Sequence, residues 1–250
     1  MGLVDGKVVL VTGGGSGMGQ AGAAIFAREG AAHVYVADVD ERGGAATVAA
    51  APGKATFVHT DVADEAAVEA LVGRIVTEQG RLDCAWNNAG ITDASGPFTA
   101  LTKDAWDRMI AVNLTSVFLC LKHELRQMEQ QGGGAIVNTS SGAGIIAAPG
   151  LPHYTAAKHG VLGLTKAAAQ EYNGRGVRVN AVCPGMVDTP MISSWFESSP
   201  DIAKAILATM PGGKLGRPAQ VAEAAVWLCS DRADWVSGLS MVVDGGAVNR

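Results

Sequence analysis

Short apolar runs alternate with longer stretches of helical spacing along the whole chain, and this alternation constrains the fold more than any other feature. Seven runs suit buried strands, at residues 7–11, 33–37, 55–59, 82–86, 135–138, 177–182 and 239–243. Unbroken apolar runs of this length, rich in β-branched residues, are typical of parallel strands covered on both faces. The sequence therefore predicts an α/β fold, with a parallel sheet of about seven strands and helices on both faces.

The alternation continues without a linker-like break, so the 250 residues are expected to form a single domain. Within it, one long helix is expected at residues 102–131. At residues 189–213 the spacing loosens around three prolines, and large apolar side chains such as Met191 and Trp195 look exposed. Such an excursion suggests a lid over a ligand, or a surface that packs on a partner subunit.

Charge and targeting signals limit the partners. A net charge of −5 provides no basic surface for nucleic acid. The N-terminus lacks the features of a signal peptide, and no apolar run approaches the ~20 residues that span a bilayer. The four cysteines are widely spaced without a metal-binding pattern, which favours buried reduced thiols and no metal site. These features predict a cytoplasmic protein whose partner is a small molecule, not a nucleic acid or a membrane.

A glycine-rich segment follows the first predicted strand. It reads Thr12-Gly13-Gly14-Gly15-Ser16-Gly17-Met18-Gly19 and leads into an alanine-rich helical stretch at residues 20–29. Glycines between a strand and a helix allow a tight turn and let a pyrophosphate approach the N–H groups at the helix N-terminus. The segment indicates a dinucleotide site, although glycines of this kind often serve only to make a turn.

Asp38 ends the second predicted strand, 19 residues beyond Gly19. This is close to the spacing of about 20 residues expected for a carboxylate that binds the adenosine ribose. A carboxylate there would repel a 2′-phosphate, which favours NAD(H) over NADP(H). Two alternatives remain open: Asp38 is an ordinary helix N-cap, and the nearby Arg42 could hold a phosphate.

Tyr154 and Lys158 are separated by one helical turn in a predicted helix that extends to about residue 172. Side chains four residues apart on a helix lie on one face, with Cβ atoms roughly 5–6 Å apart. An ammonium so close is expected to lower the tyrosine pKa from about 10, so that the hydroxyl can exchange a proton with a carbonyl oxygen near neutral pH. Ser141 could hydrogen-bond the same oxygen. Taken alone, a Tyr-Lys pair of this spacing is more often structural than catalytic.

Together these segments resemble the short-chain dehydrogenase/reductase family over essentially the whole chain. The glycine segment matches its T-G-x-x-x-G-x-G motif, residues 87–90 its N-N-A-G, Tyr154 and Lys158 its Y-x-x-x-K, and Pro184-Gly185 its P-G. Residues 244–246 (DGG) resemble its usual C-terminal tail. The resemblance implies a single-domain Rossmann fold.

The resemblance also implies functions for individual residues. The catalytic residues would be Asn113, Ser141, Tyr154 and Lys158. Tyr154 would be the general acid/base, with its pKa lowered by Lys158, while Ser141 would hold the substrate oxygen and Asn113 would bind a relay water. In isolation, Asn113 in the helix could equally be a satisfied core amide. Ser140 is the neighbour that could be confused with Ser141. The cofactor site would contain Gly13, Ser16, Gly17, Met18, Gly19, Asp38, Asp61, Val62, Asn88, Ala89, Gly90, Tyr154, Lys158, Pro184, Gly185, Val187 and Thr189.

The resemblance leads to the hypothesis of an NAD-dependent oxidoreductase that interconverts a secondary alcohol and a ketone. Ser16 supports NAD, because NADP-dependent members often carry a basic residue there. A 3-oxoacyl-[acyl-carrier-protein] reductase-like enzyme using NADPH is the first alternative, and a non-catalytic nucleotide sensor is the second. The family also implies a homotetramer, formed through the helices at residues 102–131 and 153–172.

The expected substrate pocket is mostly apolar, which suits an apolar or cyclic alcohol better than a sugar. Its expected lining residues are Ala143, Ile145, Leu151, Met186, Met191, Trp195 and Phe196. His153 is a possible polar contact, and we expect it at the pocket rim or on the surface.

Overall fold

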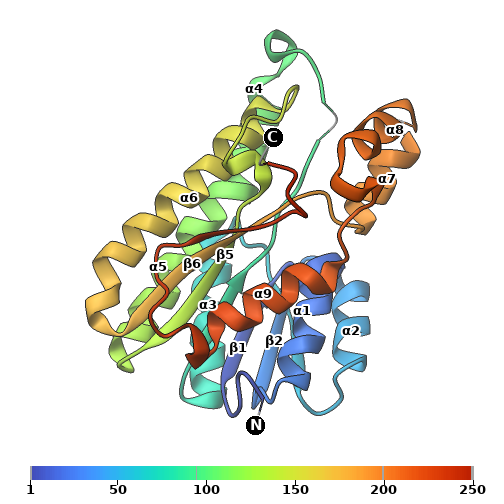
Figure 1. Ribbon diagram of the computed structural model, residues 1–250. Coiled ribbons are helices and arrows are strands. Elements are labelled where there is room, and N and C mark those ends of the chain that lie inside the picture. The colour runs from blue at the N-terminus through green and yellow to red at the C-terminus, as the bar shows by residue number, and fades with distance from the viewer. Residues whose placement is uncertain (1, 94, 199, 249–250) are drawn as a thin grey trace.

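The computed structural model describes residues 2–93, 95–198 and 200–248, and its centre is one parallel sheet (Figure 1). The strand order is β3-β2-β1-β4-β5-β6-β7. The seven strands are β1 (Val8–Thr12), β2 (His33–Asp38), β3 (Ala55–His59), β4 (Cys84–Asn87), β5 (Gly134–Thr139), β6 (Val177–Pro184) and β7 (Ser240–Val243). The predicted seven-stranded parallel sheet of the Rossmann type is therefore confirmed.

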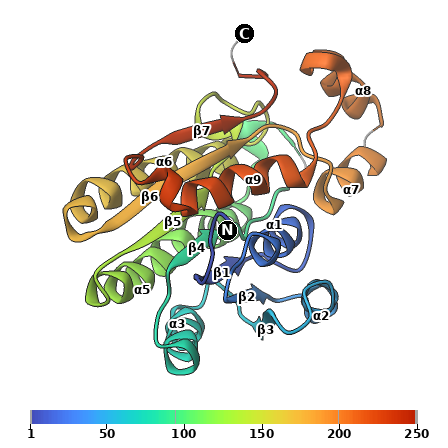
Figure 2. The same ribbon diagram turned by 60° about the horizontal axis from the view of Figure 1, so that its bottom comes forward.

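Helices cover both faces of this sheet (Figure 2). The helices α1, α2 and α9 lie on one face, and α3, α5 and α6 lie on the other. Their bounds are α1 (Gly17–Arg28), α2 (Glu41–Ala49), α3 (Glu65–Gln79), α4 (Lys103–Ile110), α5 (Ser116–Gln130), α6 (Pro152–Tyr172), α7 (Pro190–Ser198), α8 (Pro200–Thr209) and α9 (Pro218–Cys229).

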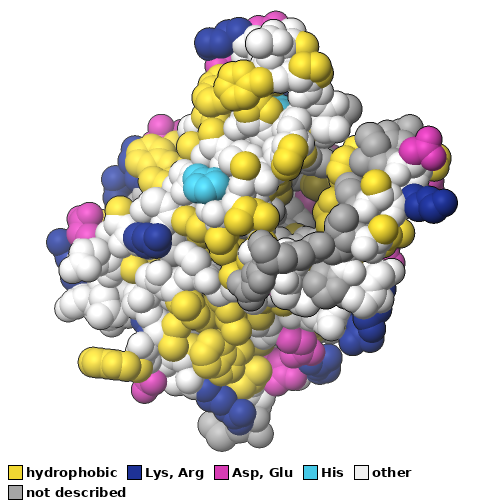
Figure 3. Space-filling model, turned by 45° about the horizontal axis from the view of Figure 1, so that its top comes forward, with side chains coloured by type: hydrophobic (Ala, Val, Ile, Leu, Met, Phe, Trp, Pro, Cys, Tyr) yellow, Lys and Arg dark blue, Asp and Glu magenta, His cyan; other side chains and the backbone are white. Residues whose placement is uncertain are grey.

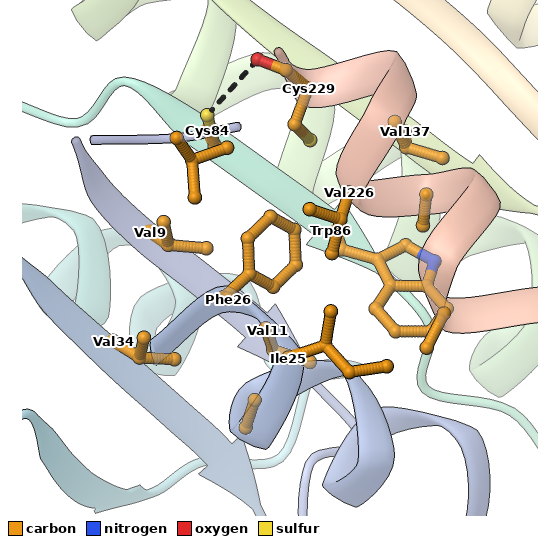
Figure 4. Close-up of a cluster of buried hydrophobic side chains, with 14 of the residues drawn as sticks. Val9, Val11, Ile25, Phe26, Val34, Cys84, Trp86, Val137, Val226 and Cys229 are labelled. Carbon is orange, nitrogen blue, oxygen red and sulfur yellow. Dashed lines mark hydrogen bonds between the residues drawn. The ribbon is translucent and has the colours of Figure 1, made fainter. Parts of the chain in front are cut away.

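Alternate residues of the strands supply the two cores. In β1, Val9 and Val11 contact one core together with Phe26 of α1, whereas Val8 and Leu10 contact the core under α3, α5 and α6. Successive side chains of a strand point to opposite faces, so a strand covered on both sides must be apolar throughout. Figure 4 shows the first of these cores, in which Trp86 and Val226 approach Phe26 from β4 and α9.

The expected single helix at residues 102–131 is not uniformly α-helical. Helix α4 is followed by a π-helical turn, η2 (Ala111–Thr115), before α5 begins. A π-turn widens a helix locally, which lets one side chain leave the regular spacing. That side chain is Asn113, which is fully buried and whose Nδ2 donates to the Ile91 carbonyl at 3.1 Å.

The segment at residues 189–213 is more regular than its spacing suggests. It forms α7, α8 and the short 3₁₀ turn η5 (Pro211–Gly213). Each of these elements begins with a proline, and the first helical position tolerates proline because its N–H needs no partner in the helix. The prolines therefore start helices here and do not interrupt them.

Two further sequence predictions concern the cysteines and the membrane. All four cysteines are free and buried, as predicted. Among the described residues, no helix is both long and apolar enough to cross a membrane.

Candidate active site

The sheet has its topological switch between β1 and β4. From β1 the chain turns to β2 and β3 on one side, and then returns to β4 on the other. In open parallel sheets, ligands bind at the carboxyl ends of the strands where the order reverses. The predicted glycine segment follows β1, residues 87–90 begin at the end of β4, and Pro184-Gly185 lies at the end of β6.

The glycine segment is shaped by close backbone contacts. Gly13 has a φ of +63°, and a Cβ on it would lie 2.7 Å from the Ala89 Cα. A Cβ on Gly19 would lie 2.1 Å from the Gly13 carbonyl oxygen. The Asn88 side chain donates to the carbonyls of Thr12 and Gly13, at 3.2 Å each. Side chains at these glycines would force the turn away from the segment after β4.

A groove of about 420 Å³ runs along these strand ends. Of the residues predicted to bind cofactor, eleven line it: Gly13, Ser16, Gly17, Met18, Asp38, Asp61, Val62, Asn88, Ala89, Gly90 and Thr189. Gly19 lies beneath the turn. The glycine turn and the carboxylate near one end fit a dinucleotide.

Asp38 presents its carboxylate to the glycine turn. Its Oδ2 accepts the Gly15 N–H at 2.8 Å, and its Oδ1 accepts the Asp40 N–H at 3.0 Å. Helix α2 is capped by Asp40, whose Oδ1 accepts the Arg42 N–H, so the helix-cap interpretation of Asp38 is wrong. Arg42 is exposed, and no lysine or arginine is among the described residues that line the groove.

A smaller cavity of about 100 Å³ continues the groove and brings the predicted catalytic residues together. Asn113, Ser141, Tyr154 and Lys158 all line it, as do the remaining predicted cofactor residues, Pro184, Gly185 and Val187. The groove and the cavity share the lining residues Met18, Asn88, Gly90, Ile91, Thr189 and Met191. A ligand that fills the groove therefore reaches the four predicted catalytic side chains.

The two neighbouring serines have different environments. Ser140 is buried and its hydroxyl donates to the Lys158 carbonyl at 2.8 Å, which ties β5 to α6. Ser141 begins the 3₁₀ turn η3 (Gly142–Gly144), where its Oγ accepts the Ala143 N–H at 3.1 Å. Its hydroxyl also bonds Tyr154 and acts to lower the tyrosine pKa. Ser141 is thus the serine that can act together with Tyr154.

Lys158 is deeply buried. Its Nζ donates to the Thr139 carbonyl at 3.0 Å and lies 5.5 Å from the centre of the Tyr154 ring. Burial lowers the pKa of Lys158 to about 8. The pKa of Tyr154 is raised, because burial outweighs the opposing bond from Ser141. Lys158 is not among the groups that shift the Tyr154 pKa here, so the expectation that it lowers this pKa stays a prediction.

Asn113 projects from the π-turn into the site. Its Oδ1 accepts the Ile91 N–H at 3.2 Å and its Nδ2 donates to the Ile91 carbonyl. A Cβ on Gly90 would lie 2.8 Å from the Asn113 Oδ1 and 3.5 Å from the Lys158 Nζ. Asn113 is thus a satisfied amide that also borders the catalytic cavity, and its binding of a relay water stays a prediction.

The predicted apolar pocket is only partly assembled around the catalytic cavity. Of its expected residues, only Met191 lines that cavity. Figure 3 shows hydrophobic side chains gathered beside a hollow that adjoins the α7–α8 segment. His153 is 2% exposed, so the expectation that it lies at the rim or on the surface is wrong.

Sequence reasoning missed a buried acid behind the site. Glu124 of α5 has no exposed surface, and its Oε2 accepts the Asn87 Nδ2 at 2.9 Å. The same Nδ2 donates to Asn138 Oδ1 at 3.0 Å. Burial raises the Glu124 pKa to about 7. Its burial is hard to foresee, since Glu124 lies in a polar stretch of sequence.

Comparison with known proteins now defines the class. A family model described as enoyl-(acyl carrier protein) reductase matches residues 13–248. The chain belongs to the short-chain dehydrogenase/reductase family, and it is an NAD(P)-dependent dehydrogenase that acts on CH–OH groups.

Individual relatives match over nearly the full chain. Cis-4-hydroxycyclohexanecarboxylate dehydrogenase of Sinomonas cyclohexanicum is 45% identical over 244 residues, covering 96% of each chain. 2,5-dichloro-2,5-cyclohexadiene-1,4-diol dehydrogenase of Sphingobium indicum is 40% identical over 244 residues, covering 97% of each. The crystal structure of levodione reductase superposes with a TM-score of 0.93 at 38% identity, covering 97% of this chain and 98% of the other.

Proposed function

We propose that this enzyme is an NAD-preferring dehydrogenase that interconverts a cyclic, mostly apolar secondary alcohol and its ketone. The observation that carries the proposal is that Ser141, Tyr154 and Lys158 line one cavity. This cavity joins a groove whose described lining includes Asp38 but no lysine or arginine, which supports the preference for NAD. The two relatives named above are dehydrogenases of six-membered-ring alcohols.

Each catalytic side chain has its own part in the transfer of the proton to or from the substrate oxygen. A nicotinamide cofactor held in the groove beside the glycine turn and Asp38 would supply the hydride acceptor for oxidation and the hydride donor for reduction. Tyr154 takes the alcohol proton in oxidation and returns it to the carbonyl oxygen in reduction. Ser141 donates a hydrogen bond to the same oxygen. Lys158 would hold the nicotinamide ribose and Asn113 would bind the water that relays the proton, and both line the same cavity as Tyr154.

Turnover on a substrate panel tests this proposal directly. Cyclohexanol, a cyclohexanediol, a linear secondary alcohol and a sugar alcohol are each offered with NAD⁺ and with NADP⁺. We expect the highest kcat/KM with a cyclic alcohol and NAD⁺. A best rate on a 3-oxoacyl thioester with NADPH would instead favour the carrier-protein reductase.

Asp38→Asn tests the basis of the cofactor preference. The amide keeps an oxygen that can accept the Gly15 N–H, but it removes the charge that repels a 2′-phosphate. Hydrogen bonds to an ionised group contribute about 1.5–3 kcal/mol, so weaker bonds from the adenosine ribose hydroxyls to residue 38 should lower kcat/KM with NAD⁺ about 10- to 100-fold. With NADP⁺ it should rise. If the ratio of kcat/KM with NAD⁺ to kcat/KM with NADP⁺ is the same in the variant and the wild type, Asp38 does not determine the cofactor preference.

We also propose that α7 and α8 act as the lid and that the enzyme is a homotetramer. Met191 and Ile192 of α7 line the catalytic cavity, which supports the lid. Phe118 of α5 is 49% exposed and Phe98 is 75% exposed, which supports an apolar contact between subunits.

Light scattering after gel filtration tests the assembly. Phe118→Glu places a charge on the proposed contact, so we expect it to convert the tetramer into smaller species. Phe98→Ser, which only removes apolar area, should weaken the assembly less. A wild-type protein that elutes as a monomer would contradict the tetramer.

A further inference from the structure

The loop between β4 and α4 is fastened to both catalytic helical segments. We define this β4–α4 loop by its described residues, 88–93 and 95–102. Its Ile91 lines both the groove and the catalytic cavity. Asn113 of the π-turn holds Ile91 through two hydrogen bonds to its backbone, of 3.1 and 3.2 Å. The position of Ile91 therefore depends on how this loop is attached to the helical segments around it.

A second attachment comes from the helix that carries Tyr154. The Nε2 of His153 lies 3.3 Å from the Asp93 Oδ2, two residues beyond Ile91. His153 is 2% exposed, whereas the Asp93 side chain is 29% exposed. The Nδ1 of His153 has no hydrogen-bond partner among the described residues. A proton on Nε2 lets the imidazole donate to the Asp93 carboxylate.

His153 does not line the catalytic cavity. It faces a separate space of about 370 Å³ between the loop and α4, bordered by Asp93, Gly96 and Arg108. Consecutive residues of a helix point about 100° apart, so Tyr154 can face the reaction while His153 faces the loop. A third attachment lies close by, where the Gly96 N–H donates to the Gly150 carbonyl at 3.0 Å.

We propose that His153 is a positioning residue that fixes the β4–α4 loop, through Asp93, to the helix that carries Tyr154. The attachment also holds Ile91 of this loop in place as part of the wall of the substrate cavity. This inference rests on the proposed alcohol dehydrogenase function. Tyr154 is held independently by its own helix and by the Lys158–Thr139 bond, so losing the attachment moves the wall and not the acid/base.

Steady-state kinetics on His153→Phe, His153→Gln and Asp93→Ala test the proposal, with cyclohexanol and NAD⁺. Phe fills the space without a hydrogen bond, whereas Gln can still donate to Asp93. We expect His153→Phe and Asp93→Ala to raise the KM for cyclohexanol about 10-fold, the equivalent of one lost hydrogen bond, with kcat within about 3-fold of the wild type. His153→Gln should restore KM to within about 3-fold. The double variant should be no worse than either single variant, because both remove one interaction.

The matched control is His33→Phe. His33 also makes one side-chain hydrogen bond, to Thr56 at 2.8 Å, but at the beginning of β2, away from the strand ends that form the site. The KM of the His33→Phe enzyme for cyclohexanol should equal that of the wild type. Additive effects in the double variant, or a His153→Gln enzyme as impaired as His153→Phe, would overturn the proposal.

A measurement without turnover separates the two proposals. In hydrogen exchange, a peptide covering residues 95–101 should exchange faster in Asp93→Ala than in the wild type, while peptides from β1 and α1 remain unchanged. If no alcohol is oxidised by the wild type but this difference is present, the proposed function fails and the attachment stands. Equal exchange in the two proteins refutes the attachment, whatever the substrate.

Discussion

We expect the Tyr154→Phe enzyme to bind NADH as the wild type does and to lose about 10²- to 10⁴-fold in kcat. General acid/base catalysis by one positioned side chain contributes a factor of this size. Phe keeps the ring that lies 5.5 Å from the Lys158 Nζ, so only the hydroxyl is removed. The measurement is steady-state oxidation of cyclohexanol with NAD⁺, beside fluorescence titration of NADH.

Two further variants locate the proton chemistry. Ser141→Ala should also lower kcat, since the Ser141 hydroxyl bonds Tyr154 and acts to lower its pKa. Ser140→Ala removes a hydrogen bond to the Lys158 carbonyl, so it should affect stability more than kcat.

A Tyr154→Phe enzyme with full activity would exclude Tyr154 as the acid/base. A wild-type protein that binds NADH but oxidises or reduces nothing on the panel would support the nucleotide sensor.

We expect Glu124→Gln to stabilise the protein by about 3 kcal/mol at pH 8 and to leave its stability unchanged at pH 4. Burial raises the Glu124 pKa from 4.5 to about 7, and each pKa unit corresponds to about 1.4 kcal/mol. A carboxyl whose folded pKa is raised binds its proton more tightly when folded. It therefore costs stability progressively as the pH rises from about 4.5 to about 7, and the full cost remains above that range.

The geometry around Glu124 supports the same direction. Its Oε1 and the Asn87 Oδ1 are both buried and find no donor among the described residues. A neutral carboxyl, or a glutamine amide, offers a hydrogen toward Asn87 while its other oxygen still accepts from Nδ2. Glutamine thus reproduces the protonated acid at every pH.

Chemical denaturation of both proteins at several pH values measures this effect. The difference in the free energy of unfolding between variant and wild type should grow from pH 4.5 to pH 7 and then level off. Glu129→Gln is the matched control, since Glu129 is on the same helix but 42% exposed and paired with Arg175. A wild type that is more stable than Glu124→Gln at pH 8 would show that the buried charge of Glu124 does not destabilise the protein.

Much of the fold could be predicted because its signals are local. A strand buried on both faces must be apolar along nearly its whole length, as in Val8–Thr12. A glycine turn must lack side chains where an added Cβ would lie within 3 Å of a neighbouring backbone. The positions of Tyr154 and Lys158 follow from the helical repeat. The order of strand ends then brings Ser141, Asn113 and Asp38 to one edge of the sheet.

Other features depended on packing between segments distant in sequence. Tertiary burial raises the pKa of Tyr154, because desolvation outweighs the single bond from Ser141. The π-turn at Asn113 follows from its bonds to Ile91, 22 residues away. Glu124 looks like a surface residue in sequence, and Asp93 and His153 are 60 residues apart.

The sequence by itself therefore determined the α/β class and the glycine turn, since each depends on spacing along one chain segment, and its resemblance to a family supplied the candidate catalytic residues. Only the tertiary structure decided which side chains are desolvated and which loops they hold. Desolvation and hydrogen bonding depend on what lies across the interior, and no local pattern of residues specifies that neighbour.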